Sequence, residues 1–354
     1  MTAPSDAWGK TPMKSHRLFL LLAVALYGLA GSSTTTSAAP GSSVTSMAAL
    51  GDSITAAWGS PGWPDISNHL ENSWATGTAA AVSSHASRFA PGPTAVVNLA
   101  KSGISVADPT QGAVAMAQAL PDNIDYVVFE GGSADLCGPW VTSPDLALSP
   151  AAFQAAIAGM LSLLQSHLAP GGRVLLASIP NWHRIWEDFP TASLPSGTRP
   201  PFACPLLFSP AANDASRNAE AAFNAAYNAA LQQACAAYLF CRYDGGAVYG
   251  IQFLLADLST TDYFHLSVSG QAKLAAATWP LVPPAGTPPT ISGTLTDGQT
   301  LSGSDGTWGG LFDVTLTRQW QRCDPGGAAC QALGGATGST YLLGAADVGS
   351  KLRL

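Results

Sequence analysis

The sequence predicts an α/β fold built on a parallel sheet, followed by a smaller region of short strands. Strand-like apolar runs alternate with helical segments up to about residue 279, and a proline-rich stretch then leads into short runs rich in Thr, Trp and Leu. Strands that alternate with helices are typical of parallel sheets with right-handed crossovers. The 354 residues suit two folded units, because one domain usually takes about 100–200.

Composition narrows the class of protein. Apolar residues make up 47% of the chain and charged residues 10%, and the net charge is −7 without a block of like charges. The apolar content allows a sizeable core and excludes a disordered chain. Nucleic-acid binding needs clustered Lys and Arg, so we expect no nucleic-acid partner. The composition says little about neutral substrates.

Residues 1–39 have the pattern of a secretory signal peptide with its cleavage region. Three basic residues precede an apolar run of 14 residues, Leu18–Gly31, which the small and polar stretch Ser32–Ser37 follows. A basic start, an apolar stretch of ~7–15 residues and small residues define such a signal. The run is shorter than the ~20 residues that span a bilayer as a helix. Cleavage after Ala30 and cleavage after Ala39 both fit, and we expect a secreted mature protein.

Six cysteines are an even set, which in an oxidising compartment favours disulfides. Closeness in sequence suggests Cys235–Cys241 and Cys323–Cys330, which leaves Cys137–Cys204. Six cysteines allow many connectivities, so these pairs are a preference. The chain has no CxxC pair, and we expect no structural zinc site.

Four strands are expected in the first domain, over residues 44–50, 94–99, 126–130 and 173–179. Three of them contain short continuous apolar runs, such as Tyr126–Phe129. Such runs are expected where helices cover both faces of a parallel sheet. Sheets of this kind carry their chemistry at the carboxyl ends of the strands.

Three helices are expected between and after these strands, over residues 151–167, 215–238 and 270–278. The first has Ser149 as a plausible N-cap and Pro150 at the first helical position. The second repeats Phe223, Tyr227 and Leu231 at a spacing of four, which places them on one face.

The connection from Ile179 to about Ala215 is too long for a simple turn. It has about 35 residues and is rich in proline. Long loops without secondary structure are usually lids, binding loops or disordered segments. We favour a cleft wall or lid over a plain surface loop.

The segment 280–289 is expected to be a stiff proline-rich linker, and 290–354 a small β-sandwich. This tail resembles the immunoglobulin-like modules at the ends of many exported bacterial proteins. The matching pieces are Gln299–Ser302, Gly306–Trp308, Gln319–Cys323 and Ala345–Gly349. Such modules need another strand after Leu354, so we expect either a truncated sequence or an incomplete module, with an unpaired edge.

Gly51-Asp52-Ser53 directly follows the first expected strand. Glycine allows a sharp turn out of the strand, and the serine can then stand where a helix begins and free N–H groups are available. An ordinary serine helix cap would explain the same residues. Near the end of the domain, Asp262 and His265 are three residues apart, and a nucleophilic serine needs such a histidine base with an orienting carboxylate.

These blocks together resemble the SGNH/GDSL hydrolase family. Gly51–Ser53 resembles its first block and Asp262–His265 its last, while Asn98–Gly103 and Glu130–Cys137 resemble the two blocks between them. The match covers residues 44–274 and so places the hydrolase domain at 40–279. The resemblance implies a three-layer α/β/α fold, ester hydrolysis through an acyl-enzyme, and no metal or other cofactor.

By position, the resemblance makes Ser53 the nucleophile, His265 the base and then the acid, and Asp262 the orienting carboxylate. It assigns oxyanion donation to the backbone N–H groups of Ser53 and Gly103. The family's third donor is an asparagine, and Ala134 stands at that position. Ser133, one residue earlier, could supply a hydroxyl instead, or the loop could shift its register. Loss of one such donor typically lowers turnover ~10²–10³-fold.

The sequence therefore predicts a secreted serine esterase or lipase that cleaves carboxylic acyl esters, with a small-molecule, lipid or carbohydrate ester as substrate. A carbohydrate-ester deacetylase would share the mechanism. The alternative from another class is a catalytically weakened hydrolase scaffold that acts as a surface-binding or adhesion protein, which Ala134 motivates. In either case the C-terminal module could contact a cell surface or polysaccharide.

Overall fold

The computed structural model describes residues 44–354, except for 196–198, 201, 283–284, 288 and 313–315. The expected signal peptide, residues 1–39, lies outside the described residues, as does part of the expected linker.

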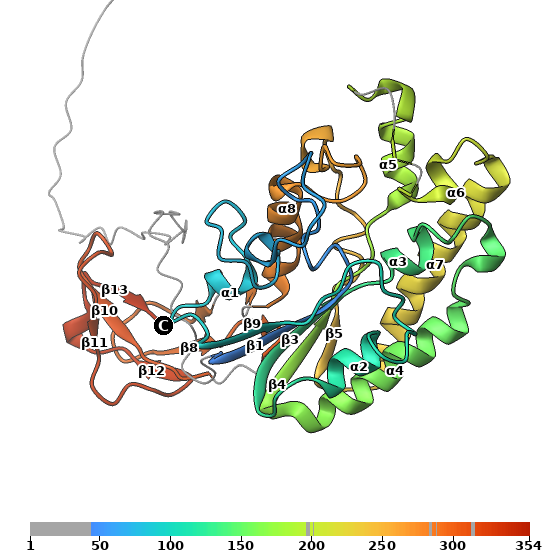
Figure 1. The fold of residues 1–354 in the computed structure, drawn as a ribbon. Coiled ribbons are helices and arrows are strands. Elements are labelled where there is room, and N and C mark those ends of the chain that lie inside the picture. The colour runs from blue at the N-terminus through green and yellow to red at the C-terminus, as the bar shows by residue number, and fades with distance from the viewer. Residues whose placement is uncertain (1–43, 196–198, 201, 283–284, 288, 313–315) are drawn as a thin grey trace, which may run out of the picture. The chain divides into compact units, whose positions relative to one another are not determined.

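A five-stranded parallel sheet forms the centre of the first domain, with strand order β2-β1-β3-β4-β5 (Figure 1). The strands are β1 (Ser46–Gly51), β2 (Ala95–Asn98), β3 (Ile124–Glu130), β4 (Leu168–Leu176) and β5 (Cys241–Tyr243). The central strands β1 and β3 are buried almost throughout, whereas β2 is a partly exposed edge. The prediction of an α/β fold on a parallel sheet is confirmed.

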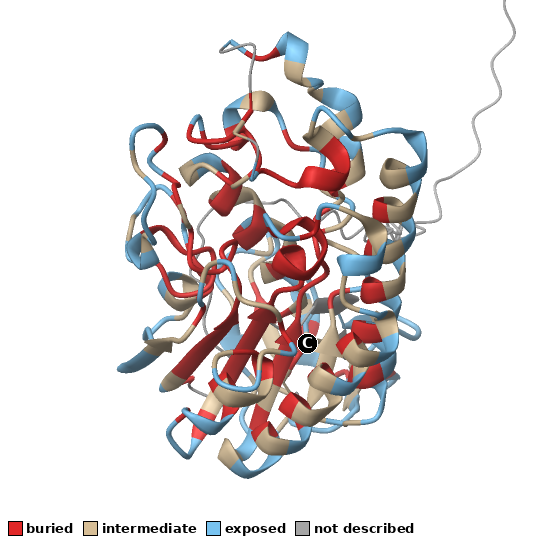
Figure 2. Cartoon of the chain, turned by 45° about the vertical axis from the view of Figure 1, so that its right-hand side comes forward, coloured by how far each residue is buried: buried red, intermediate tan, exposed pale blue. Residues whose placement is uncertain are grey.

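Helices cover both faces of this sheet and complete three layers. The α-helices are α1 (His85–Arg88), α2 (Ala113–Gln118), α3 (Ser133–Cys137), α4 (Pro150–His167), α5 (Trp182–Asp188), α6 (Pro205–Phe208), α7 (Asp214–Ala236) and α8 (Val268–Thr278). Figure 1 shows α1 and α8 on the opposite side of the sheet from α2, α4 and α7. In Figure 2 the buried strands lie inside, and the exposed residues of the helices face outward.

The three expected long helices are present as α4, α7 and α8. Ser149 caps α4 by accepting a hydrogen bond from the N–H of Ala152, and Pro150 is its first residue. By length and composition the segment Pro144–His167 could also cross a membrane, the one such helix among the described residues. Its residues Phe153, Ile157, Met160, Leu161 and Leu164 are buried in the protein core, so one face of α4 packs against that core.

Short 3₁₀ helices lie in the connections and in the tail. They are η1 (Leu70–Asn72), η2 (Pro144–Leu146), η3 (Thr191–Ser193), η4 (Leu255–Asp257), η5 (Trp279–Leu281) and η6 (Ala345–Asp347). The long connection after Ile179 contains α5, η3 and α6, and its assignment as a cleft wall or lid stays a prediction.

The C-terminal region consists of small antiparallel sheets. One sheet contains β7 (Thr290–Ser292), β8 (Thr300–Ser304) and β12 (Thr340–Leu342). A second contains β10 (Gln321–Cys323), β11 (Gln331–Ala332) and β13 (Lys351–Arg353). A third is the pair of β6 (Ala285–Thr287) and β9 (Thr307–Gly309). Trp320 is fully buried with Leu301 and Leu343, and its indole N–H donates to the carbonyl of Gly338. The C-terminal region thus contains the short strands that the sequence predicts. Its assignment as an immunoglobulin-like module stays a prediction.

All six cysteines are paired as expected, in Cys137–Cys204, Cys235–Cys241 and Cys323–Cys330. The Cys137–Cys204 bond joins the end of α3 to the residue before α6, across 67 residues of sequence. Three disulfides favour an extracellular environment, because reducing compartments keep thiols free.

A buried histidine links the sheet to α8. His85 Nε2 lies 2.8 Å from Thr278 Oγ1, and Nδ1 lies 2.9 Å from the hydroxyl of Tyr126. The Thr278 hydroxyl donates its proton to Leu274, so its oxygen accepts from Nε2–H, and Nδ1 accepts from Tyr126. Burial, with a smaller contribution from the charge of Arg88, lowers the pKa of His85 from 6.5 to about 3.

The folded protein should lose stability to acid through His85. Between pH 6.5 and about 3 the unfolded chain binds a proton that neutral, buried His85 does not, so stability falls as pH falls. The slope is at most about 1.4 kcal/mol for each pH unit. In His85→Gln the free energy of unfolding, measured with urea from pH 7 to 4, should depend less on pH. An unchanged slope would contradict this interpretation.

Candidate active site

The first candidate residue lies in a tight turn at the carboxyl end of β1. Gly51 has φ +145°, and a Cβ at this position would lie 1.8 Å from the carbonyl oxygen of Glu130 on β3. Only glycine allows this approach, in which the N–H of Asp52 donates to that carbonyl. The next residue, Ser53, is 5% exposed. β1 lies between β2 and β3, so Ser53 stands where the connections leave in opposite directions, the usual place of a site in such sheets.

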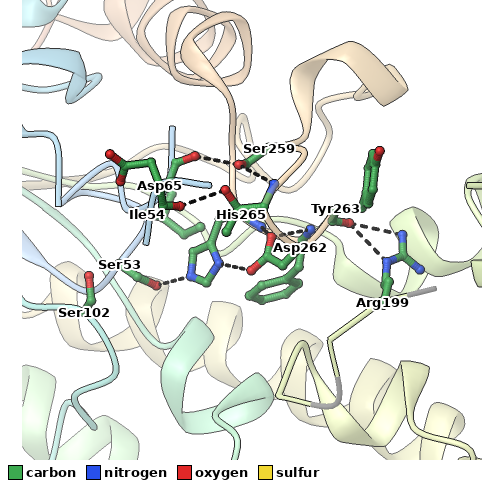
Figure 3. Close-up of polar contacts among 12 residues, drawn as sticks. Ser53, Ile54, Asp65, Ser102, Arg199, Ser259, Asp262, Tyr263 and His265 are labelled. Atoms are coloured by element: carbon green, nitrogen blue, oxygen red, sulfur yellow. Dashed lines mark hydrogen bonds and ion pairs between the residues drawn. The ribbon is translucent and has the colours of Figure 1, made fainter. Parts of the chain in front are cut away.

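Three side chains form a continuous hydrogen-bonded chain at this point (Figure 3). His265 Nε2 lies 2.8 Å from Ser53 Oγ, and His265 Nδ1 lies 2.6 Å from Asp262 Oδ2. An ionised carboxylate only accepts, so Nδ1 carries the proton and Nε2 is free to accept from the serine hydroxyl. The turn between the two residues also directs the N–H groups of Phe264 and His265 at Asp262 Oδ1, each at 2.9 Å.

These contacts keep Asp262 ionised. Burial alone would raise the pKa of this carboxyl, whose side chain is fully buried. The charge and hydrogen bond of His265, with the N–H groups of Phe264 and His265, outweigh burial and hold the pKa below its usual range. Asp262 is therefore a carboxylate at neutral pH, able to orient the imidazole and to stabilise its protonated form.

The segment that carries Asp262 and His265 is fastened to the segment that follows Ser53. Ser259 donates its hydroxyl to the carbonyl of Gly59 at 2.5 Å, and Thr261 donates to the carbonyl of Asp65 at 2.9 Å. The indole of Trp58 packs against the imidazole of His265, with ring centroids 4.5 Å apart. The two halves of the site are thus joined by direct contacts, although 212 residues separate Ser53 and His265.

The two predicted backbone oxyanion donors are free to act. Among the described residues, neither the N–H of Ser53 nor that of Gly103 donates to an acceptor. Gly103 is exposed, with φ +71° and open space where a Cβ would stand. The N–H of Lys101 donates to the carbonyl of Gly51, two residues before Ser53. The structure therefore brings the Gly103 segment to the nucleophile turn.

The third predicted oxyanion donor, the hydroxyl of Ser133, is buried and hydrogen-bonded to a neighbouring side chain. Ser133 is buried, and its Oγ accepts a hydrogen bond from the indole N–H of Trp182 at 3.1 Å. Its own hydroxyl proton has no acceptor among the described residues. Ala134 is also buried, and its backbone N–H donates to Asp52 Oδ2. No hydrogen bond joins Ser133 to Ser53 or His265 in the described part of the chain.

Two buried carboxylates that the sequence analysis did not single out hold these loops together. Asp52 accepts from the backbone N–H groups of Ile54, Gly132 and Ala134, which ties the Ser53 turn to α3. Burial raises the pKa of Asp52 despite these bonds. The only sequence signal was its place inside Gly-Asp-Ser.

The second carboxylate is Asp135. It accepts from the hydroxyl of Ser105 at 2.5 Å and from the N–H of Val106 at 3.0 Å, which ties α3 to the Gly103 segment. Burial raises the pKa of Asp135 to about 7, against the opposing effect of these hydrogen bonds. Its sequence signal was its place in the third of the four ordered blocks.

A serine, a histidine and a carboxylate in a hydrogen-bonded chain are the arrangement that serine hydrolases use, and the carboxyl edge of a parallel sheet is where such folds place their sites. The model of the GDSL-like Lipase/Acylhydrolase family matches residues 49–273, which is more than half of the chain. The chain belongs to this family and is a carboxylic ester hydrolase of the GDSL type. Among curated proteins, none matched the chain.

Several solved structures are similar to the chain at low identity. An alpha/beta hydrolase enzyme from the metagenome of Lake Arreo, Spain, is 19% identical with a TM-score of 0.42, over 68% of this chain and 94% of that one. A mutant of an acetyl-xylooligosaccharide esterase from Geobacillus Stearmophilus is 16% identical with a TM-score of 0.40, over 66% and 92%. A carbohydrate acetylesterase from Sinorhizobium meliloti is 15% identical with a TM-score of 0.41, over 66% and 95%. Similarity at this level does not indicate a shared substrate.

The position of the Gly103 segment should depend on its hydrogen bonds to Asp135. In Asp135→Ala the N–H of Val106 and the hydroxyl of Ser105 lose their acceptor, which should lower the free energy of unfolding by about 1–3 kcal/mol and reduce turnover of an acetyl ester. Asp135→Asn keeps an acceptor oxygen and should lose less of both. Urea unfolding and initial rates measure the two effects. Wild-type stability in the alanine variant would contradict this role.

Proposed function

We propose that the protein is a secreted serine esterase that hydrolyses carboxylic acyl esters through an acyl-enzyme on Ser53. The observation that supports this most is the unbroken chain Ser53–His265–Asp262, in which an ionised Asp262 requires Nδ1–H as donor and leaves Nε2 to accept from Ser53. Neutral His265 accepts the serine proton as Ser53 Oγ attacks the ester carbonyl. The imidazolium, stabilised by Asp262, then protonates the departing alcohol. Water, activated by the same imidazole, releases the acid.

We assign stabilisation of the oxyanion to the backbone N–H groups of Ser53 and Gly103 and to the hydroxyl of Ser133. The free N–H groups support the first two donors. For Ser133 the support is the direction of its bond with Trp182, because an indole N–H only donates and so leaves the serine proton available. In this assignment a hydroxyl replaces the asparagine amide that Ala134 lacks.

Export and the tail belong to the same proposal. The three disulfides and the basic, apolar and small-residue pattern of residues 1–39 support secretion. We assign 40–279 to the hydrolase domain, 280–289 to a linker and 290–354 to an immunoglobulin-like module. Its small antiparallel sheets and buried Trp320 support this assignment, and we propose that it contacts a cell surface or polysaccharide.

One observation favours a second function. Ala134 removes the side-chain donor of the third block, and an enzyme without that donor could persist as a binding scaffold. In this alternative the protein binds a surface and turns over esters poorly.

Replacement of the proposed nucleophile should separate the two functions. In Ser53→Ala, hydrolysis of a chromogenic acetyl ester should fall to background, a loss of the order of 10⁶ in turnover. A fluorophosphonate probe should label the wild-type protein on Ser53 and should not label the variant. Undiminished hydrolysis by the variant would reject the nucleophile. A folded wild-type protein that the probe does not label would favour the binding scaffold.

The Ser133 assignment has its own test. Ser133→Ala should lower kcat for the acetyl ester ~10²–10³-fold, because one oxyanion donor is lost. Ser102→Ala is a matched control, since Ser102 directly precedes Gly103 in the chain and donates its hydroxyl to Asn68. Its kcat should stay within a few fold of the wild type. Equal rates for the two variants would show that Ser133 is not a donor.

A further inference from the structure

A buried arginine from the long connection contacts the turn that carries the candidate base. Arg199 donates from Nε and Nη2 to the carbonyl of Tyr263, at 3.3 and 3.1 Å (Figure 3). The residue is only 9% exposed, and its guanidinium lies over the ring of Phe208, 3.7 Å from the ring centre. Two donors on one acceptor, with an aromatic ring against the planar group, hold the guanidinium in one place.

The carbonyl that Arg199 binds belongs to a strained residue. Tyr263 has φ +54°, a left-handed conformation that residues with a Cβ adopt rarely. Such a conformation persists where its surroundings enforce it. Tyr263 directly follows Asp262 in the turn that aims two backbone N–H groups and the imidazole of His265 at the Asp262 carboxylate.

The positive charge of Arg199 complements the negative charge of Asp262. Burial lowers the pKa of Arg199 to about 10, and the negative charge of Asp262 opposes that shift. The guanidinium is therefore a cation at neutral pH next to the turn that holds Asp262. Its own segment is anchored, because the nearby Cys204 is bonded to Cys137 at the end of α3.

We propose that Arg199 is a positioning residue for the reaction: it holds the Tyr263 carbonyl and thereby keeps the left-handed turn in which Asp262 orients His265. This inference rests on the proposed function, since it assumes that the Asp262–His265 pair acts in catalysis. It also gives the long connection a role in catalysis that does not require contact with the substrate.

The effect of Arg199 should appear in turnover more than in binding. Arg199→Met should lower kcat for the acetyl ester about 10- to 100-fold while KM changes less than about twofold, because the acting groups are misaligned. Arg199→Lys, which keeps the charge and one donor, should recover part of kcat. Arg184→Met is a matched control, because Arg184 lies on α5 and pairs with Asp188 at the surface. That variant should retain wild-type kcat.

Two further measurements separate positioning from general stability. The proton in the short bond between His265 Nδ1 and Asp262 should give a low-field NMR signal in the wild type, which should broaden or vanish in Arg199→Met and persist in Arg184→Met. Asparagine tolerates a left-handed conformation better than tyrosine. In a Tyr263→Asn background the Arg199→Met substitution should therefore lower kcat by a smaller factor.

The outcomes are distinct. Wild-type kcat and an unchanged low-field signal in Arg199→Met would overturn the proposal, as would an equal loss of kcat in both backgrounds. If Arg199→Met does not fold, kcat and the low-field signal are compared between the wild type and Arg199→Lys, and between Tyr263→Asn with and without Arg199→Met. Unchanged values in these comparisons would also overturn the proposal. If the wild-type protein neither hydrolyses esters nor reacts with a fluorophosphonate, the proposed function fails, and the NMR comparison still tests whether Arg199 aligns the pair.

Discussion

The carboxylate of Asp262 is the constraint on which the site depends. A buried negative charge is tolerated only when hydrogen bonds and opposite charge surround it. Here the N–H groups of Phe264 and His265 satisfy one oxygen, and the imidazole satisfies the other. The same bonds that stabilise the charge also direct His265 toward Ser53. The hydrogen bonds that stabilise the buried Asp262 carboxylate are therefore the same bonds that orient His265.

Buried carboxylates recur at the other loops of this edge. Asp52 joins the Ser53 turn to α3, and Asp135 joins α3 to the segment of Gly103. Each accepts backbone N–H groups that a loop would otherwise leave unpaired away from water. Three loops from different strands are thus held to one another by side chains with few rotatable bonds. Such a scaffold suits a reaction that requires fixed distances between donors.

The parallel sheet, the long helices and the disulfide pairs could be predicted, because apolar runs, the Ser149–Pro150 cap and closeness of cysteines are local signals. The structure also places Ser53 and His265 together, as the ordered blocks led us to expect. The strand β5 was missed because Cys241–Tyr243 is short and has no apolar run, and its pairing with β4 defines it. The contact of Arg199 with Tyr263 joins distant segments through a backbone carbonyl, which no residue pattern reveals.

Gly51 cannot be replaced by another residue without moving the backbone, so its codon tolerates no missense change. The neighbour that a Cβ would meet is a backbone oxygen of the central strand β3, which cannot rotate away as a flexible side chain would. Every missense change there would force two adjacent strands apart beneath the nucleophile. Only synonymous changes at this codon leave the two backbones in contact.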